Sequence, residues 1–229
     1  MKKYITIIIF ILLFIGDEIT PNPLFYHNIK SIDSISYTTL INKNNRIGSN
    51  FIPDLKKLDI NYAFDDKYME KKAALAFEDM AKAALKDGYK IIAVSAYRSY
   101  SYQEKLYEHY VKEKGYEYAD KCSARPGHSE HQTGLSVDIM GSNNDYNLFG
   151  DSIEFNWVKE NAYKYGFILR YPKGKEYITG FKYEPWHYRY VGKISKYIYE
   201  NNITLEEYFA LNNVEVRQVL RATSVYAKF

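Results

Sequence analysis

Between residues 67 and 85, apolar residues recur every three or four positions, which is the period of an amphipathic helix. The apolar positions are Ala73, Phe77, Met80, Ala81 and Ala84. Gly88 follows them, and glycine commonly ends a helix. A helix with a single apolar stripe buries that stripe against the rest of the protein. The segment is therefore predicted to be a core helix.

Short apolar runs predict strands rather than helices. The first run is Ile91, Ile92, Ala93 and Val94, within residues 89–97. Further strands are expected at residues 135–140, 167–171 and 186–191. Each of these runs is too short for a typical core helix and contains β-branched or aromatic residues.

Three further helices are predicted in the rest of the chain. Ser101 followed by Glu104 is a capping-box pattern, and it predicts a helix that ends near Gly115. Further helices are expected at residues 152–165, closed by Gly166, and at residues 192–211. Strands separated by helices and long loops, without a regular βαβ repeat, are typical of an α+β fold. The expected fold is a small, mostly antiparallel sheet flanked by helices.

The N-terminus has the layout of an export signal. Lys2 and Lys3 precede an uncharged apolar run, which is shorter than the roughly 20 residues that span a bilayer. Residues 1–16 are expected to be a signal peptide or a membrane anchor. Residues 17–36 lack a helical or strand period and are expected to be an extracytoplasmic linker. Residues 37–229 are then predicted to form one catalytic domain, a size that suits a single core.

Charge and cysteine content narrow the possible functions. The chain has 31 Lys and Arg against 28 Asp and Glu, a net charge of +3, and no long run of one sign. This balance gives no support for nucleic-acid binding. Cys122 is the only cysteine, which excludes an internal disulfide and a cysteine-based metal site. It is expected to be a buried thiol, and Cys–His nucleophilic catalysis is the alternative it leaves open.

Three of the five histidines lie in two short polar segments, SARPGHSEHQTGLSVD at 123–138 and EPWH at 184–187. A catalytic zinc takes three N or O ligands and keeps a fourth position open. His131, Asp138 and His187 could supply those ligands. His131 lies in a loop that leads into the strand carrying Asp138, and His187 would come from a neighbouring strand.

Glu184 lies three positions before His187, which would place it on the opposite face of a regular strand. Pro185 makes regular pairing unlikely there and allows Glu184 to turn toward the metal. A carboxylate in that position can act as a general base on water and then protonate the leaving amine. His128 is close to the site in sequence but is surplus to a three-ligand zinc.

These blocks resemble the LAS-type metallopeptidases and, within them, the VanY-like D-alanyl-D-alanine carboxypeptidases. Residues 129–138 fit the family pattern SxHxxGxxxD, and residues 184–187 fit its ExxH signature in the EPWH form. Residues 95–103, SAYRSYSYQ, resemble its arginine-bearing turn, and residues 40–43, LINK, resemble the start of its domain. Together the blocks span about residues 38–195.

The resemblance implies an LAS or hedgehog-like fold with a zinc site on the sheet. The zinc ligands that it implies are His131, Asp138 and His187. It also implies that Glu184 is the catalytic base and that Arg98 stabilises the oxyanion formed as water attacks the peptide carbonyl.

Three further positions are assigned to the substrate by the resemblance. Gln103 and Ser129 resemble substrate-contacting residues. Arg125 is a candidate for binding a substrate carboxylate, with a surface ion pair as the alternative. Ser136 departs from the family, which often has Ala there, but its similar size is not expected to disturb the metal.

The implied activity is removal of the terminal D-Ala from peptidoglycan stem peptides outside the membrane. An L,D-carboxypeptidase or a peptidoglycan endopeptidase could use the same zinc site. Two histidines and a carboxylate could also hold iron(II) in an oxygenase, and a non-enzymatic zinc-binding module is a further alternative. Glu184 and Arg98 favour hydrolysis over both. The expected partners are stem peptides and, through the N-terminus, the membrane, and the expected state is a monomer secreted to the cell-wall space or anchored there.

Overall fold

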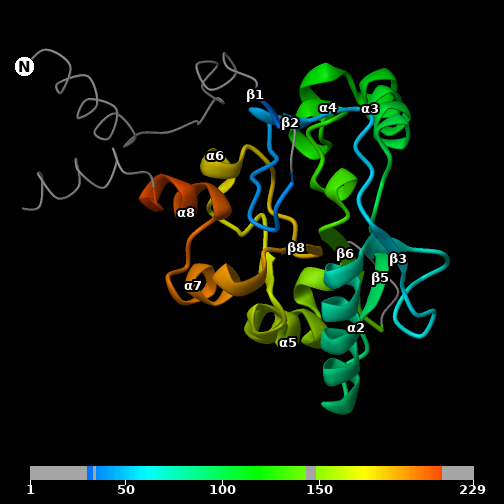
Figure 1. The fold of residues 1–229 in the computed structure, drawn as a ribbon, viewed down its shortest axis with the longest axis vertical. Coiled ribbons are helices and arrows are strands. Elements are labelled where there is room, and N and C mark those ends of the chain that lie inside the picture. The colour runs from blue at the N-terminus through cyan, green and yellow to red at the C-terminus, as the bar shows by residue number, and fades with distance from the viewer. Residues whose placement is uncertain (1–29, 33–34, 143–147, 213–229) are drawn as a thin grey trace, which may run out of the picture.

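A computed structural model describes residues 30–32, 35–142 and 148–212 (Figure 1). The predicted signal peptide or anchor at residues 1–16 lies outside the described residues, as do residues 17–29 of the predicted linker. Within the described ranges, no helix is both long and apolar enough to cross a membrane.

A four-stranded sheet lies at the centre of the domain. Its strands, in spatial order, are β5 (Ile92–Ser95), β6 (Ser136–Met140), β8 (His187–Tyr190) and β7 (Phe167–Leu169), and all neighbours are antiparallel. Each strand lies inside the range predicted for it. Every residue of the two central strands, β6 and β8, is buried. The sheet and its surrounding helices confirm the predicted α+β class.

The predicted core helix is α2 (Lys71–Lys86), and its apolar stripe is buried as expected. Phe77 of this stripe contacts Phe167 of β7 edge to face, with ring centroids 6.4 Å apart. The helix begins four residues later than predicted because residues 68–70 form a strand, β4 (Tyr68–Glu70), which pairs with β3 (Leu55–Lys57). Glu70 then caps the helix, since its carboxylate accepts from the first backbone amides.

The next two helices, α3 (Tyr100–Lys114) and α4 (Tyr116–Cys122), lie together at the upper end of Figure 1. Ser99 caps α3, because its hydroxyl accepts from the backbone amide of Tyr102 at 3.2 Å. The predicted cap, Ser101, lies inside the first turn, so the capping-box prediction was wrong by two residues. Gly115 ends α3 as predicted, with a φ of 81° that favours glycine.

The C-terminal half adds further helices: in Figure 1, α6, α7 and α8 lie to the left of the sheet, and α5 lies below it beside α2. They are α5 (Ile153–Asn161) with η4 (Ala162–Tyr165), α6 (Glu176–Thr179), α7 (Ser195–Glu200) and α8 (Leu205–Asn212). The helical range predicted at residues 192–211 is thus interrupted. The break falls at Asn202, whose φ of 50° is left-handed and ends a right-handed helix.

The remaining elements are short. They are β1 (Lys30–Ile32), β2 (Asn45–Ile47), η2 (Glu130–Thr133), η3 (Phe149–Asp151) and η5 (Gly192–Ile194). β1 pairs in parallel with β2 and lies within the stretch predicted to be linker.

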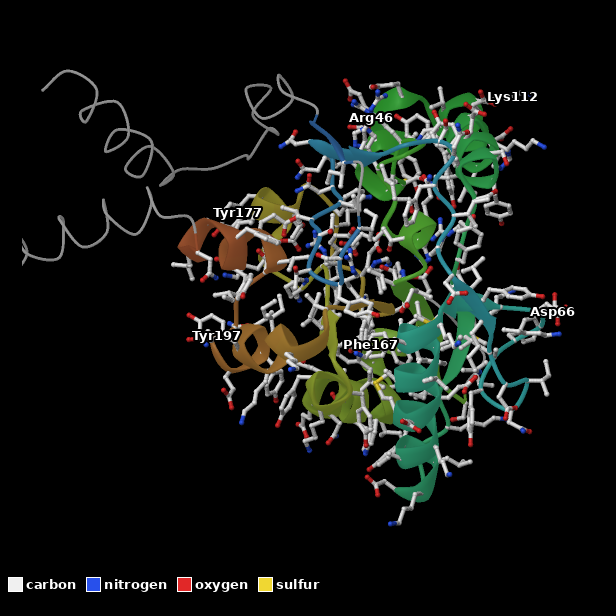
Figure 2. The ribbon with its side chains drawn as sticks, viewed as in Figure 1. Arg46, Asp66, Lys112, Phe167, Tyr177 and Tyr197 are labelled. Carbon is white, nitrogen blue, oxygen red and sulfur yellow. The ribbon has the colours of Figure 1, made fainter. Side chains whose placement is uncertain are left out.

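One continuous apolar core joins α2, the sheet and α5. Figure 2 shows Phe167 inside the molecule, where it is fully buried, whereas Tyr177 and Tyr197 lie at the rim and are about half exposed. Tyrosine suits such half-exposed positions because its ring is apolar and its hydroxyl is polar.

We expect Phe77→Ala to lower the free energy of unfolding by about 3–5 kcal/mol, because it opens a cavity between α2 and the sheet. Leu75→Ala on the same helix is the matched control, since Leu75 is 48% exposed and its loss should change stability by less than about 0.5 kcal/mol. Urea unfolding of both variants checks this. Equal losses would contradict the assigned face of the helix.

Candidate metal centre

The three predicted metal ligands meet at the centre of the sheet. Asp138 of β6 and His187 of β8 are directly opposite in the strand register. His131 lies in η2, which is capped by Gly134 two residues before β6 begins. Gly134 has a φ of 70°, and a Cβ there would come within 2.8 Å of the backbone nitrogen of Glu70. Glycine is therefore needed for the turn that brings His131 alongside the strand.

One ligand atom from each of His131, Asp138 and His187 lies within 4.8 Å of the other two. Nδ1 of His187 is 2.9 Å from Oδ1 of Asp138, and Nε2 of His131 is 3.3 Å from the same oxygen. All three side chains are buried. The sequence prediction thus grouped residues that the fold does bring together.

The protonation of His131 fits a metal ligand. Its Nδ1–H donates to the backbone carbonyl of Ala96 at 2.6 Å, which leaves Nε2 with a lone pair. Burial and the charge of Arg98 lower the pKa of His131 to about 4, so the ring is neutral at pH 7. Nε2 is buried, faces the Asp138 carboxylate and has no hydrogen-bond partner among the described residues. Two electron-rich atoms held this close favour a cation between them, and the donor set suits zinc.

His187 is held between two carboxylates. Burial opposes its charged form, but hydrogen bonds to Asp138 and Glu130 outweigh burial and raise the pKa of His187 to about 9. The two histidines in turn hold the pKa of Asp138 well below its usual value, despite burial. Because a metal ligand must give up its proton, a zinc ion bound by His187 would displace one of these ring protons.

Glu184 lies beside the ligand group. The backbone amide of His187 donates to the Glu184 carbonyl at 3.1 Å, which closes the turn expected around Pro185. This turn brings Oε2 of Glu184 to 3.9 Å from Nδ1 of His187. Burial raises the pKa of Glu184 to about 7. A carboxylate that titrates near neutrality is well matched to general acid–base work.

Arg98 follows β5 and also contacts Asp138. Its Nη2 lies 3.4 Å from Oδ2 of Asp138, and its Nη1 donates to Oε1 of Gln103 at 2.9 Å. Gln103 is fully buried and donates through Nε2 to the Ala124 carbonyl at 2.8 Å. Gln103 therefore holds Arg98 in place, and it is not among the described residues that line the cavity.

The other predicted positions differ in their surroundings. Ser129 lines the cavity, and its hydroxyl accepts from the backbone amide of His131 at 3.3 Å. Arg125 pairs with Asp120 at 2.7 Å and is not among the described cavity-lining residues, which favours the ion-pair alternative. His128 is 2.8 Å from the Asn42 carbonyl and is not one of the grouped ligands.

The metal centre opens into a cavity with polar and aromatic walls. The lining residues are Arg98, Leu106, Tyr110, Cys122, Ser123, Ala124, Ser129, Glu130, His131, Asp138, Tyr171, Phe181, Glu184, Trp186 and His187. Cys122 is only partly buried, which corrects the prediction of a buried thiol. Partial burial raises the pKa of Cys122, so it is a thiol at neutral pH and a poor nucleophile.

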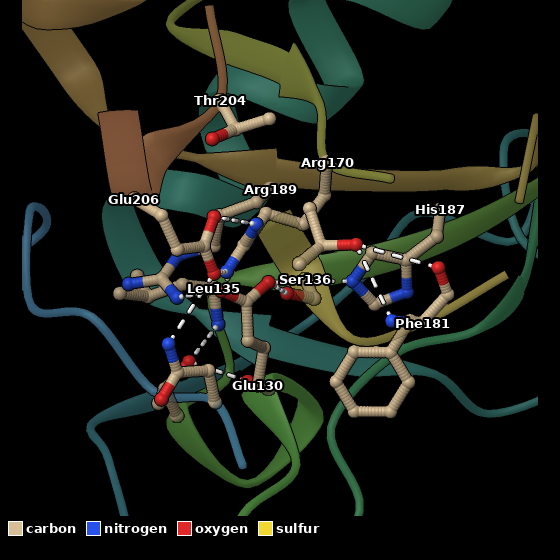
Figure 3. A network of polar contacts seen from close by, with 12 residues as sticks. Glu130, Leu135, Ser136, Arg170, Phe181, His187, Arg189, Thr204 and Glu206 are labelled. Carbon is tan, nitrogen blue, oxygen red and sulfur yellow. Dashed lines mark hydrogen bonds and ion pairs between the residues drawn. The ribbon is translucent and has the colours of Figure 1, made fainter. Parts of the chain in front are cut away.

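Sequence reasoning missed a charged cluster behind the metal ligands (Figure 3). Glu130 accepts from Arg170 and Arg189, each at 2.8 Å, and Arg170 also pairs with Glu206. Both arginines are fully buried. The available signal was their position: each interrupts or directly follows an apolar strand, where a charged residue needs a buried partner.

Comparison with known proteins gives one family. The sequence model of VanY, D-alanyl-D-alanine carboxypeptidase, matches residues 66–193. The chain is 44% identical to YodJ of Bacillus subtilis over 210 residues, covering 85% of this chain and 77% of that protein.

Solved structures with the same fold differ in activity. The LdcB LD-carboxypeptidase has a TM-score of 0.72 and 44% identity, covering 82% of this chain and 95% of its own. A mutant of the vancomycin resistance D,D-pentapeptidase VanY in complex with Zn(II) has a TM-score of 0.66 and 34% identity, covering 76% and 98%.

We expect His131→Ala to lose most zinc affinity, because it removes one of three ligands, whereas His128→Asn should keep it. An asparagine amide can still donate to the Asn42 carbonyl, so the control preserves the local contact. Zinc content after dialysis and competition with a chromophoric chelator measure both variants. Parental affinity in His131→Ala, or its loss in His128→Asn, would show that the ligand set is wrong.

Proposed function

Because the chain belongs to the VanY family of D-alanyl-D-alanine carboxypeptidases, we propose that it removes the terminal D-Ala from peptidoglycan stem peptides. The observation that carries the proposal is the grouping of His131, Asp138 and His187 within 4.8 Å, with Glu184 beside them at the wall of a cavity. The enzyme is a carboxypeptidase of this family, and its cofactor is zinc, since a structural relative has been solved in complex with Zn(II).

The three grouped residues would hold the zinc ion, which would act as a Lewis acid that polarises the scissile carbonyl and lowers the pKa of water. Glu184 then accepts a proton from the attacking water and delivers it to the leaving amine. Its burial suits both steps, since a pKa of about 7 lets the carboxyl group take up and release a proton near neutrality. This use of Glu184 disfavours an oxygenase or a binding module.

Arg98 stabilises the negative charge that develops on the carbonyl oxygen. A guanidinium that is already held in position needs little reorganisation during the reaction. Gln103 provides that hold through its 2.9 Å contact with Nη1. Ser129 lies on the cavity wall, where its side chain can contact the peptide.

The residue that precedes the scissile bond distinguishes two candidate activities. The first is D,D-carboxypeptidase activity, in which terminal D-Ala follows another D-Ala, and the family description supports it. The second is L,D-carboxypeptidase activity on tetrapeptide stems, and the 44% identity to LdcB supports it. Both release D-Ala, so both need the same zinc chemistry.

The proposed place of action is outside the cytoplasmic membrane, where peptidoglycan is located. The export-signal pattern at residues 1–16 supports this proposal, either as a cleaved signal peptide or as an anchor that keeps a monomer near the wall.

D-Ala release from matched pentapeptide and tetrapeptide stems tests the activity. We expect release to stop with a chelator and to return with zinc. Release from the pentapeptide alone supports D,D-carboxypeptidase activity, and preference for the tetrapeptide supports L,D-carboxypeptidase activity. If neither releases D-Ala while a cross-linked peptide is cut, the enzyme is an endopeptidase and the proposal is wrong.

We expect Glu184→Gln to lower kcat/KM by roughly 100–10,000-fold, because an amide cannot act as a general base. Zinc affinity should stay close to that of the parent. Glu160→Gln, on the exposed side of α5, is the control and should leave both quantities unchanged. Full activity in Glu184→Gln would remove Glu184 from the mechanism.

A further inference from the structure

The charged cluster behind the zinc ligands is not used by the proposed chemistry. Glu130, Arg170 and Arg189 have side chains with no solvent exposure, and burying charged groups is unfavourable unless they are paired. Burying this cluster costs free energy, and the cluster lies directly against a candidate zinc ligand. We therefore expect a role beyond packing.

The two carboxylate oxygens of Glu130 have separate partners (Figure 3). Oε1 accepts from Nε of Arg170 and from Nη1 of Arg189, both at 2.8 Å. Oε2 accepts from the hydroxyl of Ser136 at 3.2 Å and lies 3.4 Å from Nε2 of His187. The arginines therefore fix one oxygen, and the other faces the histidine.

An ionised carboxylate can accept hydrogen bonds but cannot donate them. The two arginines pair with Glu130 as an ionised carboxylate, because both guanidinium groups donate to its Oε1 at 2.8 Å. Its contact with His187 therefore requires a proton on Nε2. Nδ1 is then the ring atom available to a metal, and it already lies 2.9 Å from Asp138.

We propose that Glu130 is a positioning residue that fixes His187 with its proton on Nε2 and its Nδ1 toward the zinc. This inference rests on the zinc site of the proposed function. His131 has the complementary arrangement, since the Ala96 carbonyl takes its Nδ1–H and leaves Nε2 for the metal. A hydrogen-bonding partner on the far nitrogen orients a ligand histidine and makes it a better donor.

Arg170 and Arg189 connect Glu130 to distant parts of the chain. Arg189 donates through Nη2 to the carbonyls of Tyr37 and Thr39, at 3.3 and 2.9 Å. Arg170 donates through both terminal nitrogens to Glu206 of α8, at 2.8 and 2.6 Å. The planar guanidinium can hold two partners in fixed directions, which lysine cannot do. Glu130 is thus held from both ends of the described domain.

The substitution Glu130→Gln gives a sharp test. The two arginines need an oxygen at the Oε1 position, so the new amide would direct its NH2 group toward His187. That group donates to Nε2 and so favours a proton on Nδ1, where it competes with zinc. We expect the zinc Kd to rise roughly 10–100-fold, as is typical when a ligand's hydrogen-bonding partner is lost.

Two controls separate positioning from packing. Ser136→Ala removes a donor to the same Oε2 but leaves the contact with His187, and its zinc Kd should stay near that of the parent. Glu206→Gln weakens the cluster on the side away from His187, so stability should fall with little change in zinc Kd. Chelator competition and unfolding of the metal-free proteins measure both quantities. An unchanged Kd in folded Glu130→Gln would overturn the proposal.

Nitrogen-15 NMR of the zinc-loaded parent tests the proposal without any variant. We expect the His187 ring to carry its proton on Nε2 and to show the metal-induced shift on Nδ1. The reverse assignment would overturn the proposal even if Glu130→Gln failed to fold. None of these measurements uses a peptide substrate, so a failed carboxypeptidase assay would leave this result standing.

Discussion

The antiparallel pairing of β6 with β8 is the constraint on which the metal centre depends. It places Asp138 directly opposite His187 at the centre of the sheet, with every residue of both strands buried. A slip of one residue would turn one of these side chains to the other face of the sheet. The core formed by α2, α5 and the sheet opposes such a slip, because the apolar partners of the two strands would also be exchanged. Packing at a distance therefore sets the ligand geometry.

Different charged neighbours give three nearby carboxylates different properties. Asp138 and Glu130 face histidines or arginines, which hold their pKa values below the usual range although burial alone would raise them. Glu184 has weaker compensation, so burial dominates and raises its pKa to about 7. Neighbouring acids whose environments separate their pKa values commonly have separate roles. The roles proposed for these three carboxylates are metal ligand for Asp138, positioning group for Glu130 and proton carrier for Glu184.

Local sequence patterns predicted the four strands of the central sheet and the residues that meet at the candidate metal centre. The apolar runs predicted the four strands, and the two polar segments predicted which residues would meet. The Ser99 cap of α3 was missed because two nearby serines could each cap the helix, and backbone geometry decides between them. Glu130 was missed for a different reason. Its partners, Arg170 and Arg189, are distant in sequence, and a glutamate between Ser129 and His131 has no periodicity that would indicate burial.

The residues that line the cavity include several from segments outside the two motifs. The motifs therefore predict the reaction better than they predict the substrate. The candidate metal ligands come from two short segments, residues 123–138 and 184–187. The wall is contributed by other elements, including Leu106 and Tyr110 of α3 and Phe181 after α6. A pocket discriminates between substrates through the shape and polarity of its walls, whereas the zinc acts on the carbonyl common to every peptide bond. Because zinc chemistry and substrate contacts are encoded in different segments, relatives with the same metal centre can differ in the peptide they cut.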